Sequence, residues 1–353
     1  MPVSPPTVRR SAKRFRAGGL ALALAATVGL VLSGCAAGAT STNSSGVPLQ
    51  KVSVAYSSPG ASYSDLYVGI SEGVFKNNGL DVDLRTLNSS SQIIPALLSG
   101  SVDIAVGSAT DSAAAIMKGS DLMFVAITRP VFNLEVYTSS DINSAADLKG
   151  KKIGLTTPGS QSDQALTAYL AENHMTRDDV QPVYVNSIPG QLAALQSNAV
   201  SAILSQPPQA AAALTKGYKA LTQLSNIPFP SAGVVVTKDY LTAHPDLVEA
   251  FVKSEVQSLQ LLQTDQAATI AAIEQYSGDT DPTQAAYAYN FFKNVWSTDP
   301  VVDPALINQA FQITAATTGT PAPTDITQYI DNSFVSKYAT AAPTGSPTTT
   351  PTP

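Results

Sequence analysis

The chain has 353 residues, of which 44% are hydrophobic and 13% charged, and its formal net charge at pH 7 is −6. The first 34 residues contain five Lys and Arg residues, all within the first 16 positions, and no Asp or Glu. The rest of the chain therefore has 15 basic and 26 acidic residues, a net charge of −11. Such a surface disfavours nucleic acid as a partner, because nucleic-acid binding depends on Lys and Arg that neutralise phosphates.

The first 34 residues have the pattern of a secretory signal peptide. A basic segment is followed by an apolar run of about 16 residues, 17–32, and then by Ser33 and Gly34. The run is short for a membrane span, which needs roughly 20 residues. Cys35 is the only cysteine, so neither an internal disulfide nor a zinc–thiolate cluster can form, and we expect no metal and no cofactor.

Cys35 follows Leu32-Ser33-Gly34 directly, and this segment resembles the bacterial lipobox. The resemblance implies that Cys35 becomes the lipid-modified first residue of the mature protein, on the extracytoplasmic face of the membrane. Two or more acyl chains hold a protein stably to a bilayer, whereas one holds it only marginally. The alternative is an ordinary buried cysteine.

Residues 35–50 are small and polar after Cys35 and predict a flexible tether, and residues 339–353, rich in Thr and Pro, predict a disordered tail. The roughly 290 residues between them exceed the size at which one core usually divides into two. Strand-like runs are predicted first at 51–56, 80–84, 102–106 and 122–127, with helical runs at 63–75, 91–98 and 113–117.

A second alternating set follows, and then a helical region. Strands are predicted at 152–155, 181–185, 200–204 and 220–224, helices between them at 162–172, 189–196 and 208–215, and long helices at 246–264, 266–276, 282–295 and 304–316. Strands separated by helical crossovers predict right-handed βαβ units and a parallel sheet.

Five segments, taken together and in this order, resemble the substrate-binding proteins of ABC importers for alkanesulfonates, taurine, nitrate and thiamine-related pyrimidines. The segments are 67–82 (YVGISEGVFKNNGLDV), 97–106 (LLSGSVDIAV), 146–154 (ADLKGKKIG), 192–197 (LAALQS) and 329–335 (YIDNSFV). Each is weak alone, but their order and spacing behind a lipobox are specific.

The resemblance implies an α/β architecture, the type II periplasmic binding protein fold, in which two lobes joined by a hinge close on a ligand in the cleft between them. Lobe 1 is expected to hold residues 51–136 and 229–338, and lobe 2 residues 137–228, with chain crossings near 132–137 and 226–233. The expected partners are a small-molecule ligand and a membrane permease with its cytoplasmic ATPase, and the protein itself is expected to be a monomer.

Four Ser- and Thr-rich loops follow predicted strands, where ligands bind in open α/β sheets and where helix N-termini present unpaired N–H groups. Hydroxyl groups there can donate to an anion, but Ser and Thr are also the usual helix N-caps, so each residue is a candidate for either role. The loop candidates are Ser57, Ser58, Tyr63, Ser90, Ser91, Ser108, Thr110, Thr157, Gly159, Ser160 and Gln161.

Two further candidates come from other positions. Arg129 could clamp a carboxylate or sulfonate bidentately, or form an ion pair between the lobes, or be a solvated turn residue. Gln206 ends a predicted strand of the second lobe and could face the cleft. Tyr63, Tyr67 and Phe132 could form an aromatic wall, although the spacing of the two tyrosines also fits core packing.

Three functions stay open. A solute-binding protein is the first, and a lipid-anchored sensory or adhesion subunit is the second. The third is an enzyme related to thiamine-pyrimidine synthases. It is disfavoured because the only histidines, His174 and His244, are expected in surface turns, and no nucleophile, phosphate-loop or zinc pattern is found. Trp296 is expected in the core.

Overall fold

The computed structural model describes residues 48–57, 59–87, 92–278 and 281–339, all within one compact unit. Several predictions lie outside the described residues and stay predictions: the signal peptide, Cys35, most of the tether and of the tail, and Ser58, Ser90 and Ser91.

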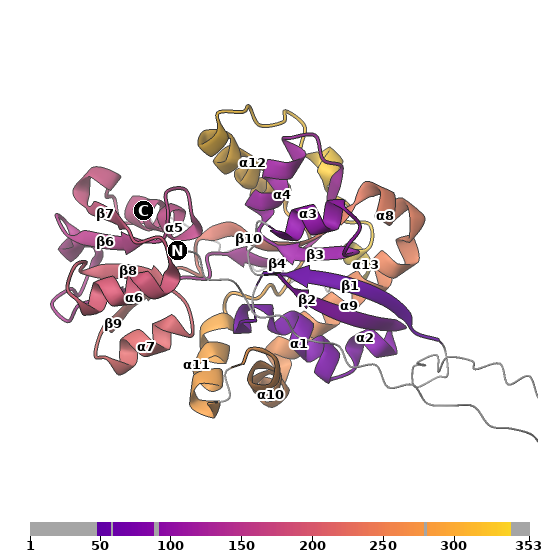
Figure 1. The fold of residues 1–353 in the computed structure, drawn as a ribbon, viewed down its shortest axis with the longest axis horizontal. Coiled ribbons are helices and arrows are strands. Elements are labelled where there is room, and N and C mark those ends of the chain that lie inside the picture. The colour runs from indigo at the N-terminus through magenta and orange to yellow at the C-terminus, as the bar shows by residue number, and fades with distance from the viewer. Residues whose placement is uncertain (1–47, 58, 88–91, 279–280, 340–353) are drawn as a thin grey trace, which may run out of the picture. The chain divides into compact units, whose positions relative to one another are not determined.

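Five strands form the first sheet, in the order β2-β1-β3-β10-β4 (Figure 1). β1 (Gln50–Tyr56) pairs in parallel with β2 (Leu80–Thr86) and β3 (Ile104–Gly107). β10 (Pro228–Thr237), which comes from much later in the chain, pairs antiparallel with β3 and with β4 (Leu122–Val131).

Helices cover both faces of this sheet (Figure 1). Val52 and Val54 of β1 face a core formed with helices α1, α9, α10 and α11, whereas Ala55 faces a core formed with α3, α4 and α12. This alternation is the period of two that a strand imposes on its side chains. The helices are α1 (Ser64–Ser71), α2 (Val74–Asn77), α3 (Ile93–Leu98), α4 (Ala109–Ile116), α8 (Lys238–Ala243), α9 (Pro245–Thr264), α10 (Gln266–Tyr276), α11 (Pro282–Phe292), α12 (Pro304–Thr318) and α13 (Val335–Tyr338), with 3-10 turns at Ala61–Tyr63 and Thr327–Tyr329.

The second sheet has the order β7-β6-β8-β5-β9. β6 (Lys152–Leu155) is parallel to β7 (Gln181–Tyr184) and β8 (Ala202–Ser205), whereas β5 (Glu135–Thr138) is antiparallel to β8 and to β9 (Lys219–Gln223).

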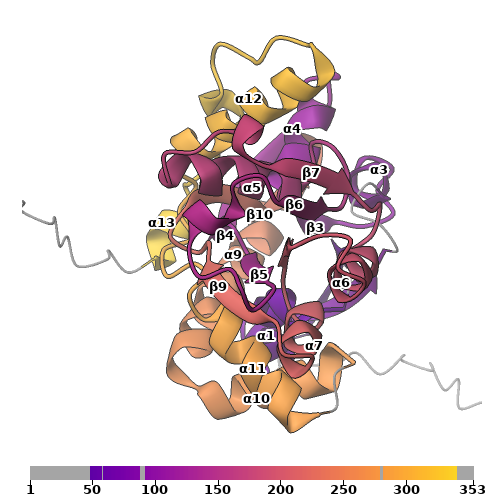
Figure 2. The ribbon, with the colours of Figure 1, turned by 90° about the vertical axis from the view of Figure 1, so that its left-hand side faces the viewer.

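Helices also cover both faces of the second sheet, as Figure 2 shows from the side of this lobe. Helix α5 (Gln161–Glu172) packs on one face, and α6 (Ile188–Gln196) and α7 (Gln209–Thr215) pack on the other. Two 3-10 turns lie at Ala145–Leu148 and Arg177–Asp179.

The prediction of two α/β lobes is confirmed, and both sheets contain the predicted parallel strand pairs, but neither sheet is parallel throughout. Each sheet contains one strand that runs against its neighbours, β10 in the first and β5 in the second, because the chain enters the second sheet through β5 and returns to the first through β10. β5 begins at Glu135, two residues inside the range predicted for lobe 1. The lobe boundaries themselves stay predictions.

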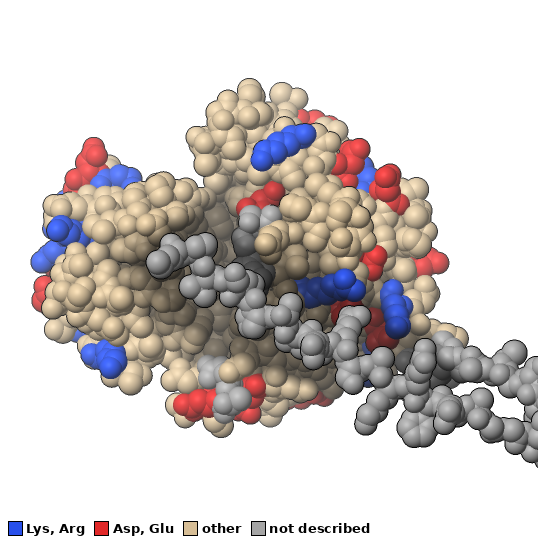
Figure 3. Space-filling model, viewed as in Figure 1, with Lys and Arg blue, Asp and Glu red and all other residues tan. Residues whose placement is uncertain are grey.

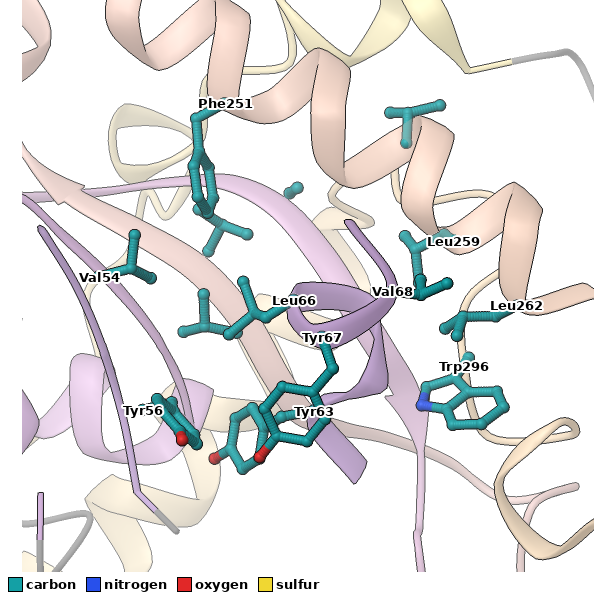
Figure 4. Packing of buried hydrophobic residues seen from close by; sticks show 14 of the residues in the cluster. Val54, Tyr56, Tyr63, Leu66, Tyr67, Val68, Phe251, Leu259, Leu262 and Trp296 are labelled. Carbon is teal, nitrogen blue, oxygen red and sulfur yellow. The ribbon is translucent and has the colours of Figure 1, made fainter. Parts of the chain in front are cut away.

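The single helix predicted over 63–75 is also wrong. A 3-10 turn precedes α1, which ends at Ser71, and α2 begins at Val74. Gly73 lies between them with φ +70°, a left-handed conformation that glycine adopts without steric cost and that ends a helix. Figure 4 shows the core that α1 builds: Leu66 and Val68 lie between the sheet and the Phe251, Leu259 and Leu262 side chains of α9.

Candidate ligand-binding site

A cavity of about 560 Å³ lies where loops of both sheets meet. β1, β3, β6 and β8 each end directly before a segment that lines it, in keeping with the rule that ligands in α/β sheets lie beyond the carboxyl ends of the strands. The lining residues are Ser57, Ser62, Tyr63, Ser108, Thr110, Asp111, Arg129, Asn133, Thr157, Pro158, Gly159, Ser160, Gln161, Gln164, Ile188, Gln206, Phe229 and Ser231.

Every predicted site residue that the structure describes belongs to this lining. These ten residues are Ser57, Tyr63, Ser108, Thr110, Arg129, Thr157, Gly159, Ser160, Gln161 and Gln206. The structure therefore brings together, from two lobes, residues that are up to about 150 positions apart. Whether they contact a ligand stays a prediction.

Eight lining residues were not among the predicted site residues. Ser62, Asp111 and Pro158 belong to the predicted loops, and five others lie outside those loops: Asn133, Gln164, Ile188, Phe229 and Ser231. Three of them, Asn133, Phe229 and Ser231, lie at the two chain crossings that the sequence analysis expected near 132–137 and 226–233. A cleft between lobes is bordered by the segments that connect them, so the crossings themselves were the signal. Gln164 and Ile188 carried no signal of their own.

Two helix N-termini face the cavity through their capping residues. Ser108 caps α4 and Ser160 caps α5, each accepting a hydrogen bond from the backbone N–H three residues on, at 3.4 Å, from Asp111 and Asp163 respectively. Both serines therefore cap a helix and line the cavity, so the two roles considered for them are compatible. The first turns of α4 and α5 place the partial positive charge of each helix beside the cavity.

The loop before α5 is a tight turn that needs glycine. Gly159 has φ +73°, and its backbone N–H donates to Asp163 Oδ2 at 2.8 Å. Asp163 also pairs with Arg177 through Oδ1 at 2.6 Å, which fixes the carboxylate behind the turn. Asp163 thus supports the loop from behind, and it is not among the lining residues.

Arg129 is the one positively charged side chain among the described lining residues, and it is 2% exposed. Its Nη1 donates to the backbone carbonyl of Ser62 at 2.6 Å and lies 3.7 Å from Asp65 Oδ2, while the guanidinium carbon lies 4.3 Å from the centre of the Tyr63 ring. Within the described part of the chain, Nε and Nη2 have no hydrogen-bond acceptor. A guanidinium edge without an acceptor is a bidentate site for an oxyanion.

Two of the alternatives for Arg129 are wrong. It is buried in β4, so it is not a solvated turn residue, and its ion-pair partner Asp65 belongs to α1 of the same lobe, so the pair does not join the lobes. Hydrogen bonds between side chains of the two lobes are made elsewhere, by Asn133 Nδ2 to Gln206 Oε1 at 2.7 Å and by Gln161 Nε2 to Ser231 Oγ at 2.9 Å.

Of the three residues predicted for the aromatic wall, Tyr63 lines the cavity, whereas Tyr67 and Phe132 do not. Tyr63 lines the cavity, with its hydroxyl 2.7 Å from Ser57 Oγ, but Tyr67 is fully buried in the core, stacked on Tyr276. Phe132 is buried behind Phe229, with ring centroids 4.0 Å apart, and it is Phe229 that lines the cavity.

The expectations for Trp296, His174 and His244 are confirmed. Trp296 is 3% exposed, and its indole N–H donates to the Ser62 carbonyl at 3.3 Å, next to the Arg129 contact with the same oxygen. His174 and His244 are exposed at the ends of helices. Across the described ranges, no cluster of His, Cys, Asp and Glu could hold a metal ion, and no helix is both long and apolar enough to span a bilayer.

Two α/β lobes with a polar cavity between their loops define the periplasmic binding protein fold. The chain belongs to the NMT1/THI5-like family, whose model matches residues 61–268. It is similar to the periplasmic aliphatic sulphonate binding protein of Escherichia coli in structure, with a TM-score of 0.68 and 18% identity over 81% of this chain and 99% of the other.

Curated relatives are similar over shorter stretches. A putative aliphatic sulfonates-binding protein of Escherichia coli is 24% identical over 56% of this chain and 62% of its own length. The taurine-binding periplasmic protein of the same organism is 30% identical over 52% of this chain and 58% of its own length. The chain thus spans less than two thirds of either relative.

Proposed function

We propose that this protein is the extracytoplasmic solute-binding component of an ABC importer. It captures a small molecule with an anionic group in the cavity and delivers it to a membrane permease with a cytoplasmic ATPase. Arg129 carries the proposal: a buried guanidinium lines the cavity, and two of its nitrogens have no acceptor in the described part of the chain.

The charges of the lining favour a monoanion. Arg129 and Asp111 are its only charged residues among those described, and the other polar groups are hydroxyls and amides. The N-termini of α4 and α5 add partial positive charge, which stabilises anions without a further cation. Arg129 can balance one negative charge of a dianion, and the second negative charge would face only the partial charges of the helix N-termini.

Apolar side chains make room for an organic part of the ligand. Tyr63, Ile188 and Phe229 line the cavity, and Ile188 is 40% exposed. The cavity thus offers a charged group at one place and apolar side chains at others, and a small organic sulfonate or carboxylate has matching charged and apolar parts. The names of the relatives support the sulfonate, since they bind aliphatic sulfonates and taurine.

We also propose that Cys35 anchors the protein by lipid modification, and that the protein acts as a monomer.

We further propose that the protein binds its ligand and does not transform it. The described cavity lining offers neither histidine nor cysteine, which argues for binding over an enzyme of the thiamine-pyrimidine synthase type. An uptake assay in cells that lack the gene separates transport from a sensory or adhesion role.

A thermal-shift screen of the chain from residue 36 onward tests the ligand class. The compounds are taurine, ethanesulfonate, an aryl sulfonate, nitrate, bicarbonate and thiamine. A compound at about 100 times its Kd stabilises the protein by about 2.7 kcal/mol, and each kcal/mol raises the midpoint by about 2–4 °C in a domain of this size. Stabilisation by thiamine alone, with no response to any anion, would contradict an anionic ligand.

A further inference from the structure

Two buried carboxyl groups lie on α1 and α9, two helices that pack against each other, and α9 also contacts β4, the strand of Arg129. Asp65 of α1 and Glu255 of α9 are both 0% exposed, and Arg129 lies 3.7 Å from Asp65. Among the described residues, none of the four carboxyl oxygens has a hydrogen-bond partner, nor do the buried hydroxyls of Thr128 and Ser258. Buried charges are normally paired or hydrogen-bonded, so one positive charge cannot satisfy two carboxylates here.

The surroundings decide which carboxyl group carries the proton. Burial raises the pKa of Glu255 well above its usual value, the negative charge of Asp65 raises it further, and Arg129 lowers it. Burial also raises the pKa of Asp65, but the positive charge of Arg129 acts against that rise. The 3.7 Å ion pair with Arg129 favours the charged form of Asp65, whereas full burial without an ion-pair partner in the described part of the chain favours the neutral acid at Glu255.

The elements packed against α9 supply no second cation to Glu255. Among the described residues, only Asp65 of α1 and Arg129 of β4 act on it. Lys337 of α13 pairs with Glu249 at 3.0 Å instead. The other titratable residues on these elements are Tyr67, Lys76, Asp81, Asp83, Arg85, Lys238, Asp239, Tyr240, Glu274, Tyr276 and Tyr338.

We propose that Glu255 is a proton-binding residue that positions the charge of Arg129 for the ligand. While Glu255 holds its proton, Asp65 alone balances Arg129, and the free Nε and Nη2 edge can accept the anionic group of the ligand. When Glu255 loses the proton, a second buried negative charge faces the same guanidinium and repels that group. The inference rests on the proposed function, because it assumes an anion in the cavity.

The consequence is a proton-linked affinity. Anion binding is strongest below the raised pKa of Glu255 and weakens as the pH rises through it, because the weaker-binding form is the ionised one. For one linked proton, the affinity falls by up to about tenfold per pH unit above that point.

Titrations with ethanesulfonate across neutral to alkaline pH test this linkage. The fluorescence of Trp296, the only tryptophan, reports binding, since its indole shares the Ser62 carbonyl with Arg129. We expect the affinity of the wild type to fall with rising pH and that of Glu255→Gln, which mimics the protonated acid, to stay level over the same range. Glu249→Gln, a change on the same helix but outside the cavity lining, should keep the wild-type profile.

A ligand-free measurement separates this inference from the proposed function. The infrared difference spectrum between wild type and Glu255→Gln at neutral pH should contain the C=O band of a protonated carboxylic acid, and that band should disappear at alkaline pH. A carboxylate band at neutral pH, or parallel pH profiles of wild type and Glu255→Gln, would overturn the inference. If ethanesulfonate binds at no pH while the acid band is present, the ligand class is wrong but Glu255 is the proton site.

Discussion

At the scale of single residues, Arg129 combines a structural and a binding role, and the two can be separated by mutation. Arg129→Gln leaves Asp65 buried without a cation, which costs about 3–5 kcal/mol when a buried pair is broken on one side. It also removes the bidentate donor, for an affinity loss of roughly 100-fold. Urea denaturation measures the first effect and titration with ethanesulfonate the second.

The double variant Asp65→Asn/Arg129→Gln provides the separation. It removes both buried charges, so we expect it to recover most of the lost stability without recovering affinity. Arg85→Gln is the matched control, because the Arg85–Asp83 pair is exposed and such pairs contribute about 0–1 kcal/mol. If the double variant bound ethanesulfonate as well as the wild type, Arg129 would be a structural residue only.

At the scale of elements, the N-terminus of α5 should act through its partial charge. Ser160→Asp keeps a good N-cap, so the free energy of unfolding should change little, but the added carboxylate lies at the cavity. We expect anion affinity to fall roughly tenfold from charge repulsion. Thr237→Asp makes the same kind of change at the N-cap of α8, outside the cavity lining, and should leave affinity as it is. If both variants bound ethanesulfonate with equal affinity, the N-terminus of α5 would not contribute to anion binding.

The elements also show how far local sequence reasoning reaches. The long helices were predicted almost to the residue: 246–264 against Pro245–Thr264, and 266–276 against Gln266–Tyr276. Their apolar period and capping residues are local signals. β10 was not predicted, because Pro228 and Pro230 at its start weaken the strand pattern. Its antiparallel direction was not predictable either, because that direction depends on how the chain returns from the second sheet.

The same limit applies to the site. Loops after strands were predicted because position relative to a strand is a local property. The acidic residues that act on Arg129 could not be predicted in this way, because Asp65 lies 64 positions earlier and Glu255 lies 126 positions later. No local sequence pattern joins residues so far apart. Asn133 and Ser231 likewise gain their place only when the two lobes meet.

At the scale of the whole molecule, the lobes contact each other beyond the cavity as well. Helix α11 of the first lobe reaches the second sheet: the hydroxyls of Tyr287 and Tyr137 are 2.8 Å apart, and Gln223 Nε2 donates to the Phe291 carbonyl at 2.6 Å. Hydrogen bonds across the lobes therefore occur both at the cavity and at α11. A ligand that binds both lobes adds to contacts that already exist, and it shifts the lobe arrangement only by its extra affinity for one state.

The net charge of the molecule opposes the ligand that the cavity favours. The chain after the predicted signal peptide has a net charge of −11, and on the face in Figure 3 Asp and Glu side chains are spread over its outer parts. A distant anion is therefore repelled, although Arg129 and the helix N-termini attract it at short range. Salt screens the long-range repulsion more than the buried contacts, because the Debye length is about 8 Å at physiological ionic strength.

We therefore expect the association rate of ethanesulfonate to rise with ionic strength, by roughly twofold to threefold between low and physiological salt, while the dissociation rate changes little. Stopped-flow fluorescence of Trp296 measures both rates. A Glu72→Lys/Asp178→Lys variant, which changes two exposed acids outside the lining, should bind faster at low salt and show a smaller salt effect. An association rate that falls with salt would mean that local attraction at the cavity mouth, and not net charge, governs the encounter.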